Sequence, residues 1–442
     1  MTVSPLVRAG QFAQAARQGA IILVALALPR LGVGREVIGE WEGLLYVGYL
    51  LGFGWLTGLL QAYLVRIRLT RPALTATFSR LAIVGIGVFS ALLLSLAALL
   101  HEGLFSVLRL GEAPTGWWWF FAFLLTQWPG LFFEQVLLIR EKAWELAAFG
   151  GLSALGFALA ILLPLYHGAD LATALFWLAL TAGAKGVLLM SWVLLDRWRN
   201  PPPPPVSEGP RENELRPLLR EWLRTAWPLI TYAVAGTLVT AFDPWFVNYW
   251  YADDEAIFAT FRYGARELPL LAAIINGTMV VVLPRLTEAP VAGLDLLKAS
   301  SRRLFHWIFG GATLLMLTSP WWWTLVFTDL FAGSLPLFQA YLLLVISRLI
   351  FPTPVLTAFG HTRLLALISL SELLSNLALS WLLATYFGLL GIIWATVIAD
   401  ILNRLVLVWY LYYRTGIPPG RYIDLRVFVG YCLVLVVAYL LV

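Results

Sequence analysis

The chain has 442 residues, of which 60% are hydrophobic and 12% are charged, and its formal net charge is +5. So few charged groups cannot coat a water-soluble globule of this size, which excludes a soluble enzyme. The surplus of arginine and lysine lies in short gaps between apolar stretches, where membrane topology explains it, so we expect no nucleic-acid partner. The single cysteine and four scattered histidines predict neither an internal disulfide nor a metal site.

Apolar stretches of about 20 residues, the length that crosses a bilayer, recur along the chain. They predict an all-α polytopic membrane protein with about thirteen transmembrane helices. The predicted spans are 11–30, 42–65, 81–101, 117–139, 144–166, 171–195, 223–249, 256–284, 304–327, 336–359, 363–387, 389–412 and 425–442. The first span follows a polar start and lacks a small-residue cleavage pattern, so we expect it to be retained.

Basic residues collect in every second gap between the spans. These gaps are 66–80, 140–142, 197–216, 285–303, 363 and 414–426. By the positive-inside rule they are cytoplasmic, which places the amino terminus inside and, after thirteen spans, the carboxyl terminus outside. We expect a multi-pass protein of the cell inner (cytoplasmic) membrane.

The longest polar interruption separates two sets of six spans and includes prolines 201–205, which favour a semi-rigid spacer. We predict an N-terminal lobe at 1–198, a linker at 199–222, a C-terminal lobe at 223–413 and one extra helix at 414–442. Because six is even, the lobes can be pseudo-symmetric parallel repeats. The end of the linker is either a surface-lying amphipathic helix or a basic stop before the seventh span. No gap is long enough for a folded extramembrane domain.

Several charged residues fall inside predicted spans, where a charge costs about 2.5 to 3.5 kcal/mol and requires a partner or a hydrated cavity. In the first half, Arg17 and Gln18 lie on a polar face of the first span. Glu134 in the fourth span and Lys185 in the sixth lie at a similar predicted depth. The first half therefore gathers cations and an acid inside the membrane.

The second half carries a larger set of polar residues within its spans: Asp243, Arg262, Arg266, Arg348, Glu372, Asn376, Asp400 and Arg404. Two interpretations remain open. The charges can pair with one another, as Asp400 and Arg404 would one helical turn apart. Alternatively, the arginines line a cavity, since guanidinium groups suit bidentate binding of phosphate or carboxylate. We predict the first for Asp400 with Arg404 and the second for Arg262, Arg266 and Arg348.

Three segments, 28–58, 242–287 and 355–400, carry a family resemblance. Their features include a short glycine-containing gap after the first span and Asp243 before an acidic turn. Further features are Tyr263, Ala265, Arg266, Pro269, Pro284, Gly360, Asn376, Gly388 and Gly391. The chain resembles the O-antigen or capsule polysaccharide flippases of the multidrug/oligosaccharidyl-lipid/polysaccharide (MOP) exporter superfamily, and more distantly the lipid II flippases. Lipid II flippases usually have fourteen spans, so the single extra helix favours the polysaccharide type.

The resemblance implies two six-helix lobes around a central cavity that opens alternately to either side of the membrane. It also implies a polyprenyl-diphosphate oligosaccharide as substrate, moved from the inner to the outer leaflet, with Arg17, Arg262, Arg266 and Arg348 engaging the diphosphate. We add Lys185, Gln18, Glu372 and Asn376 as substrate-binding candidates. Asp243, Asp400 and Glu134 are candidates for coupling transport to sodium ions or protons. We expect a monomer in contact with membrane lipids and glycan-assembly enzymes, with no cofactor.

Two alternatives remain open. A drug or organic-cation exporter of the same superfamily would require an acidic cavity, whereas the deep charges here are slightly cationic. A membrane glycosyltransferase or polysaccharide polymerase would require a large outer loop with catalytic groups, and the longest outer gap, 102–116, offers only Glu102, Arg109 and Glu112. We therefore predict a transporter and not an enzyme.

Overall fold

The computed structural model describes residues 5–70, 72–199, 212–251, 254–265, 282, 285–286, 289–359 and 361–442. Within these ranges the regular elements are helices, and no strand occurs. The chain divides into two compact units, Met1–Ala241 and Phe242–Val442. Eight of the described helices are long and apolar enough to cross a membrane, or nine if one bent pair counts as a span. The predicted all-α, multi-pass class is thereby confirmed.

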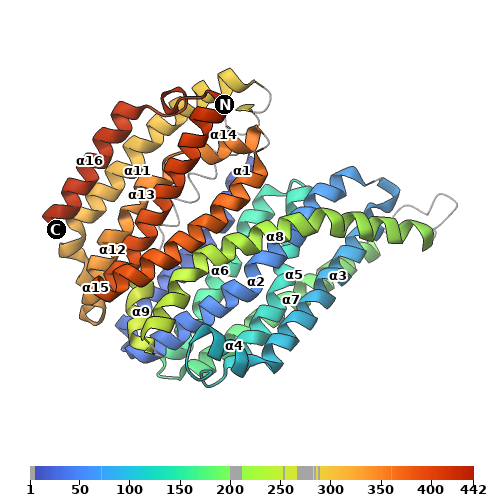
Figure 1. Cartoon of the computed structure of the whole chain (residues 1–442). Coiled ribbons are helices and arrows are strands. Elements are labelled where there is room, and N and C mark those ends of the chain that lie inside the picture. The colour runs from blue at the N-terminus through green and yellow to red at the C-terminus, as the bar shows by residue number, and fades with distance from the viewer. Residues whose placement is uncertain are drawn as a thin grey trace. The chain divides into compact units, whose positions relative to one another are not determined.

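Unit 1 is built from helices that follow the predicted spans (Figure 1). They are α1 (Pro5–Ala27), η1 (Leu28–Leu31), α2 (Arg35–Leu69), α3 (Pro72–Leu99), α4 (His101–Leu108), α5 (Trp117–Ile139), α6 (Ala143–Tyr166), α7 (Leu171–Arg199) and most of α8 (Glu212–Tyr251). Helices α1 and α6 approach closely where both carry small residues. A Cβ added at Gly150 would lie only 2.3 Å from the Cβ of Ala13, so a larger residue than glycine would not fit there. This close packing positions the polar residues of α1 against the interior of the unit.

Helix α8 runs unbroken from Glu212 to Tyr251, so the amphipathic segment and the predicted seventh span form one helix. Trp222, in the amphipathic segment, is buried, and its indole nitrogen lies 3.4 Å from the carbonyl oxygen of Leu59. Arg220 and Arg224 are exposed. The amphipathic segment therefore forms the first turns of the membrane helix and packs on α2. Prolines 201–205 lie outside the described residues. The predicted lobe boundaries remain predictions.

Unit 2 continues α8 with α9 (Glu255–Gly264), α11 (Pro290–Phe327), η2 (Asp329–Ser334), α12 (Leu335–Leu342), α13 (Leu344–Arg348), α14 (Pro352–Ala358), α15 (Thr362–Tyr410), η3 (Leu411–Thr415), η4 (Pro419–Arg421) and α16 (Leu425–Leu441). Gly388, with φ of 58°, divides α15 into two arms that match the predicted spans 363–387 and 389–412. A side chain is strained at such a positive φ, which is why glycine stands at this bend.

The predicted span 336–359 is discontinuous, since it consists of α12, α13 and α14. The break between α13 and α14 falls just before Pro352, which cannot donate a backbone hydrogen bond. Discontinuous membrane helices occur where they are buried in protein or line a cavity. The break therefore marks an interior part of unit 2.

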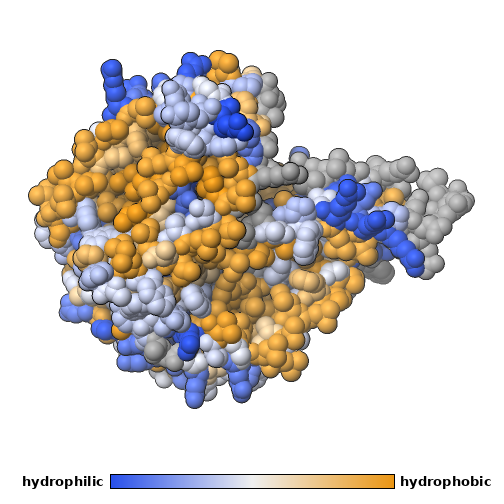
Figure 2. All heavy atoms as spheres, in the orientation of Figure 1, coloured by the Kyte–Doolittle hydropathy of each residue, from blue (hydrophilic) through white to orange (hydrophobic). Residues whose placement is uncertain are grey.

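Apolar side chains cover broad areas of the face shown in Figure 2. Many large ones are exposed, among them Leu99, Trp307, Leu325 and Leu440, each at more than 70%. A soluble protein would bury such residues, whereas lipid tails solvate them. This surface agrees with a multi-pass membrane protein.

Candidate functional site

An ion pair joins α1 to α5 inside unit 1. One guanidinium nitrogen of Arg17, Nη1, donates to both carboxylate oxygens of Glu134, each at 2.8 Å. The Glu134 side chain is 9% exposed and the Arg17 side chain 37%. Charged hydrogen bonds strengthen where water is scarce, so Arg17 is a close internal counterion for the Glu134 carboxylate.

A cavity of about 140 Å³ lies beside this pair. Its polar lining consists of Arg17, Gln127, Glu134, Ser153 and Lys185, and Phe149 is among its apolar lining residues. The Lys185 ammonium lies 5.9 Å from the centre of the Phe149 ring and has no ion pair among the described residues. Two cations therefore face one carboxylate, so the cavity is net cationic.

A second buried carboxylate, Asp243 of α8, lies in unit 2. The Asn376 amide donates to its Oδ1 at 2.9 Å, and the Thr396 hydroxyl donates to its Oδ2 at 2.6 Å. The Ser380 hydroxyl donates in turn to Asn376 Oδ1 at 3.2 Å. No arginine or lysine of the described residues forms an ion pair with Asp243, so its buried charge has only neutral donors around it.

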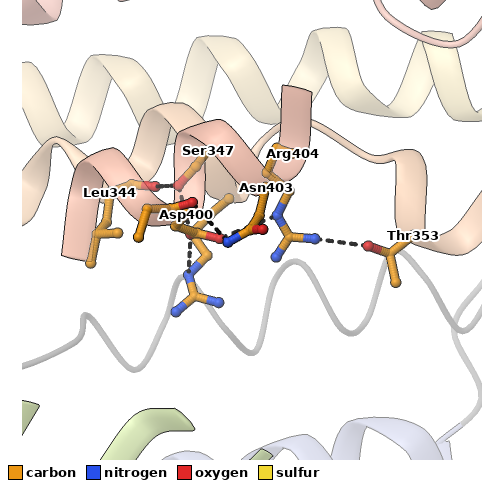
Figure 3. A network of polar contacts seen from close by, with 8 residues as sticks. Leu344, Ser347, Thr353, Asp400, Asn403 and Arg404 are labelled. Carbon is orange, nitrogen blue, oxygen red and sulfur yellow. Dashed lines mark hydrogen bonds and ion pairs between the residues drawn. The ribbon is translucent and has the colours of Figure 1, made fainter. Parts of the chain in front are cut away.

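A third cluster surrounds Asp400 on the second arm of α15 (Figure 3). The Ser347 hydroxyl donates to Asp400 Oδ2 at 2.7 Å. Nε of Arg348 lies 3.7 Å from the same oxygen, and Nε of Arg404 lies 3.4 Å from Oδ1. The predicted Asp400–Arg404 ion pair is therefore observed. Arg404 also donates to the Thr353 hydroxyl at 2.8 Å, which ties both sides of the broken span to α15.

Two atoms of this third cluster lack hydrogen-bond partners. Asp400 Oδ1 and Arg404 Nε are buried, and neither forms a hydrogen bond within the described part of the chain. Glu372, on the first arm of α15, interacts electrostatically with Asp400, Arg404 and Arg348. These two atoms are the 3.4 Å ion pair described above, a contact without hydrogen-bond geometry, and a buried polar atom without a hydrogen bond is costly.

The second and third clusters lie one helical turn apart on both arms of α15. Glu372 precedes Asn376 by four residues, and Asp400 follows Thr396 by four residues. Four residues correspond to about 6 Å along a helix. The two arms of α15 therefore contribute to two adjacent polar clusters. Asn376 and Thr396 contact Asp243 of α8, and Asp400 and Arg404, one turn away, contact the broken span.

The remaining predicted residues are placed as follows. Arg262 lies half-buried on α9, and Arg266 lies outside the described residues. Gln18 is exposed and does not line the unit 1 cavity. Asn376, a predicted substrate-binding residue, donates to Asp243. Ser347 and Thr353 were not predicted from the sequence, although the nearby Pro352 signalled a break.

Solved structures share this fold. The lipid II flippase MurJ, in an inward closed conformation, is 12% identical, covers 98% of this chain and 95% of its own, and has a TM-score of 0.58. A MOP superfamily transporter from Pyrococcus furiosus is 13% identical over 93% and 95%, with a TM-score of 0.59. The Vibrio cholerae MATE transporter VcmN, in its bent form, is 16% identical over 97% of each chain, with a TM-score of 0.55.

No family model and no curated protein sequence matches the chain. The structural likenesses nevertheless confirm the MOP superfamily fold that the sequence resemblance predicted. At identities this low, a shared fold does not show that the chain has the same substrate as these proteins.

Proposed function

We propose that the protein moves a polyprenyl-diphosphate oligosaccharide from the cytoplasmic to the outer leaflet by alternating access. The observation that carries the proposal is the cavity of unit 1, where Arg17 and Lys185 face the single carboxylate of Glu134. A cationic cavity inside an apolar helix bundle attracts an anionic group and is unfavourable for an organic cation. The likeness to the lipid II flippase supports a lipid-linked substrate.

The arginines around Asp400 supply a second place for phosphate. Arg348 is 36% exposed at its side chain, and the neighbouring Arg404 Nε has no hydrogen-bond partner in the described chain. A phosphate oxygen entering this cluster would accept a hydrogen bond from Arg404 Nε, which Asp400 Oδ1, 3.4 Å away, does not accept. Outward movement of the diphosphate across an inside-negative membrane gains about 2.3 kcal/mol per charge per 100 mV.

Sodium coupling at Asp243 completes the proposal. Oxygen atoms of Asp243, Asn376, Thr396 and Ser380 gather at this buried position, and hard cations prefer oxygen ligands. A buried carboxylate without a cationic partner is costly, so a bound cation would stabilise it. These residues fit a sodium ion, which would supply charge neutralisation at Asp243.

The test is transport by purified protein in proteoliposomes. A polyprenyl-diphosphate oligosaccharide is placed in both leaflets, and a membrane-impermeant glycan oxidase reports how much reaches the outer one. We expect complete oxidation with the wild type, with no other change in glycolipid mass. We also expect at least a tenfold lower rate for Arg348→Gln. The exposed Arg303→Gln serves as a matched control on a neighbouring helix and should transport normally. Oxidation limited to the original outer leaflet in the wild type would refute the proposal.

Export of an organic cation is the second candidate, and one observation favours it. Asp243 is a buried anion without a cationic partner in the described chain, and one of the similar structures is a MATE transporter. The fixed Lys185 ammonium in the unit 1 cavity opposes it. Accumulation of a fluorescent organic cation by the same vesicles, without glycolipid transport, would replace the first proposal with the second.

A further inference from the structure

A polar seam runs between α11 and α16 at the end where both helices begin, which the charge pattern predicts to be cytoplasmic. Lys298 donates to the carbonyl oxygen of Gly420 at 2.7 Å. Arg302 lies 3.8 Å from Asp424, a long separation for an ion pair, and its side chain is 60% exposed. The Arg302 guanidinium therefore remains available to a further anion at the edge of the seam.

The next turn of the seam contains an imidazole and a phenol. His306 Nδ1 lies 2.7 Å from the Tyr431 hydroxyl, and the other ring nitrogen of His306 has no partner in the described chain. His306 is exposed. This pair offers hydrogen bonds next to the apolar side chain of Trp307, which is 80% exposed.

The following turn of the seam is open. Gly310 is exposed, and a Cβ added there would meet no atom within 4 Å. Val434, one turn beyond Tyr431 on α16, is 52% exposed. Along the seam, a guanidinium is thus followed by a hydrogen-bonding pair and then by open space at Gly310.

Arg302, His306 and Gly310 are spaced four residues apart and share one side of α11. Each step rises about 6 Å along the helix. A glycerophospholipid has the same order of chemistry from its phosphate through its ester groups to its acyl chains. We propose that this seam binds one anionic glycerophospholipid, with the phosphate at Arg302, the ester region at His306 and Tyr431, and an acyl chain over Gly310.

The occupant has a structural role. Helix α16 packs chiefly on α11 among the described elements (Figure 1), through Phe305, Phe309, Phe428 and Tyr431. A lipid held along one edge of this contact would fasten α16 to α11. The site is independent of the transport proposal.

Native mass spectrometry of the full chain tests the site. The protein is released from nanodiscs that contain equal amounts of phosphatidylglycerol and phosphatidylcholine with identical acyl chains. We expect the wild type to retain one phosphatidylglycerol preferentially, and Arg302→Gln to lower that preference about tenfold. Arg426→Gln is the matched control: Arg426 is exposed, lies two residues beyond Asp424 and so projects from the opposite face of α16. It should retain lipid like the wild type.

Gly310→Leu keeps every charge while filling the open space at Gly310, so it separates a shaped site from general attraction to a basic surface. We expect it to lower phosphatidylglycerol retention about as much as Arg302→Gln. Equal losses in Arg302→Gln and Arg426→Gln, or full retention in Gly310→Leu, would overturn the proposal. Preferential capture of a polyprenyl diphosphate over phosphatidylglycerol at this seam would also overturn it. Unchanged melting in phosphatidylcholine alone verifies that each variant folds.

Discussion

Glu134 in unit 1 and Asp243 in unit 2 are buried to nearly the same degree, with 7% and 8% of the whole residue exposed, yet their charges are balanced differently. Glu134 accepts two hydrogen bonds from Arg17 and lies near Lys185. Among the described residues, Asp243 accepts hydrogen bonds only from the neutral side chains of Asn376 and Thr396. Arg17 thus supplies the counterion of Glu134, whereas the described part of the chain supplies none for Asp243.

This difference separates two roles for an intramembrane carboxylate. A carboxylate with an internal cation stabilises the fold, and removing it leaves that cation unpaired. A carboxylate without one is costly until an exchangeable cation binds, and removing its charge eliminates that cost. The same change from carboxylate to amide should therefore have opposite effects on stability in the two units.

Asp243→Asn should produce the largest effect. We expect sodium chloride, compared with choline chloride at equal ionic strength, to raise the unfolding temperature of the wild type. The variant should lose this response entirely, because the charged ligand is gone, while its unfolding temperature in choline equals or exceeds that of the wild type. Thermal unfolding in detergent provides the measurement. A sodium response that survives in Asp243→Asn would remove the proposed difference between the units.

Glu134→Gln should act in the opposite direction. Removing the carboxylate leaves the partly buried Arg17 without its partner and should lower the free energy of unfolding by about 1 to 3 kcal/mol. Its sodium response should equal that of the wild type. Adding Arg17→Gln to this variant should restore part of the loss, which a double-mutant cycle by chemical unfolding in mixed micelles would reveal. Additive losses would mean that the two groups do not stabilise each other.

Sequence alone located most helices but not their breaks. The predicted span 117–139 coincides with α5, because apolar length and the flanking residues determine where a membrane helix lies. The predicted span 336–359 consists of three helices in the structure. Hydropathy could not predict this division, because it measures apolar length and does not reveal where backbone hydrogen bonds stop. Pro352 was a local signal of that break.

The sequence predicted which helix faces are polar, but it did not predict which side chains on different helices contact each other. Helical spacing predicted the Asp400–Arg404 pair because both residues lie on one helix. It could not predict that Asn376 approaches Asp243, since these residues are 133 positions apart on different helices. Nor could it show that Asp243, unlike Glu134, has no cationic partner among the residues that the structure describes. Charge balance in a buried site depends on tertiary packing, which single-helix patterns do not contain.

Thr396→Val should sharpen the comparison by keeping the charge of Asp243 and removing one oxygen ligand. The loss of the 2.6 Å hydrogen bond to Asp243 and of a ligand oxygen should weaken sodium binding about tenfold, or about 1.4 kcal/mol. The midpoint of the sodium-dependent rise in unfolding temperature provides the measurement. Thr126→Val, in unit 1, is the matched control, because its hydroxyl bonds only to backbone carbonyl groups of its own helix. An unchanged midpoint in Thr396→Val would exclude this hydroxyl from the site.

Lys185→Gln should have the smallest effect on stability and thereby separate the two cations of unit 1. Lys185 has no ion pair in the described chain, so its removal leaves the Arg17–Glu134 pair intact and should change the free energy of unfolding by less than about 1 kcal/mol. The cavity nevertheless loses its surplus positive charge, so the affinity for polyprenyl diphosphate should fall about threefold, as measured by titration in detergent. Lys142→Gln, at an exposed position, should leave that affinity unchanged. If Lys185→Gln destabilises the protein as strongly as Glu134→Gln, then Lys185 is a counterion of the fold and the cavity has no cation to offer a substrate.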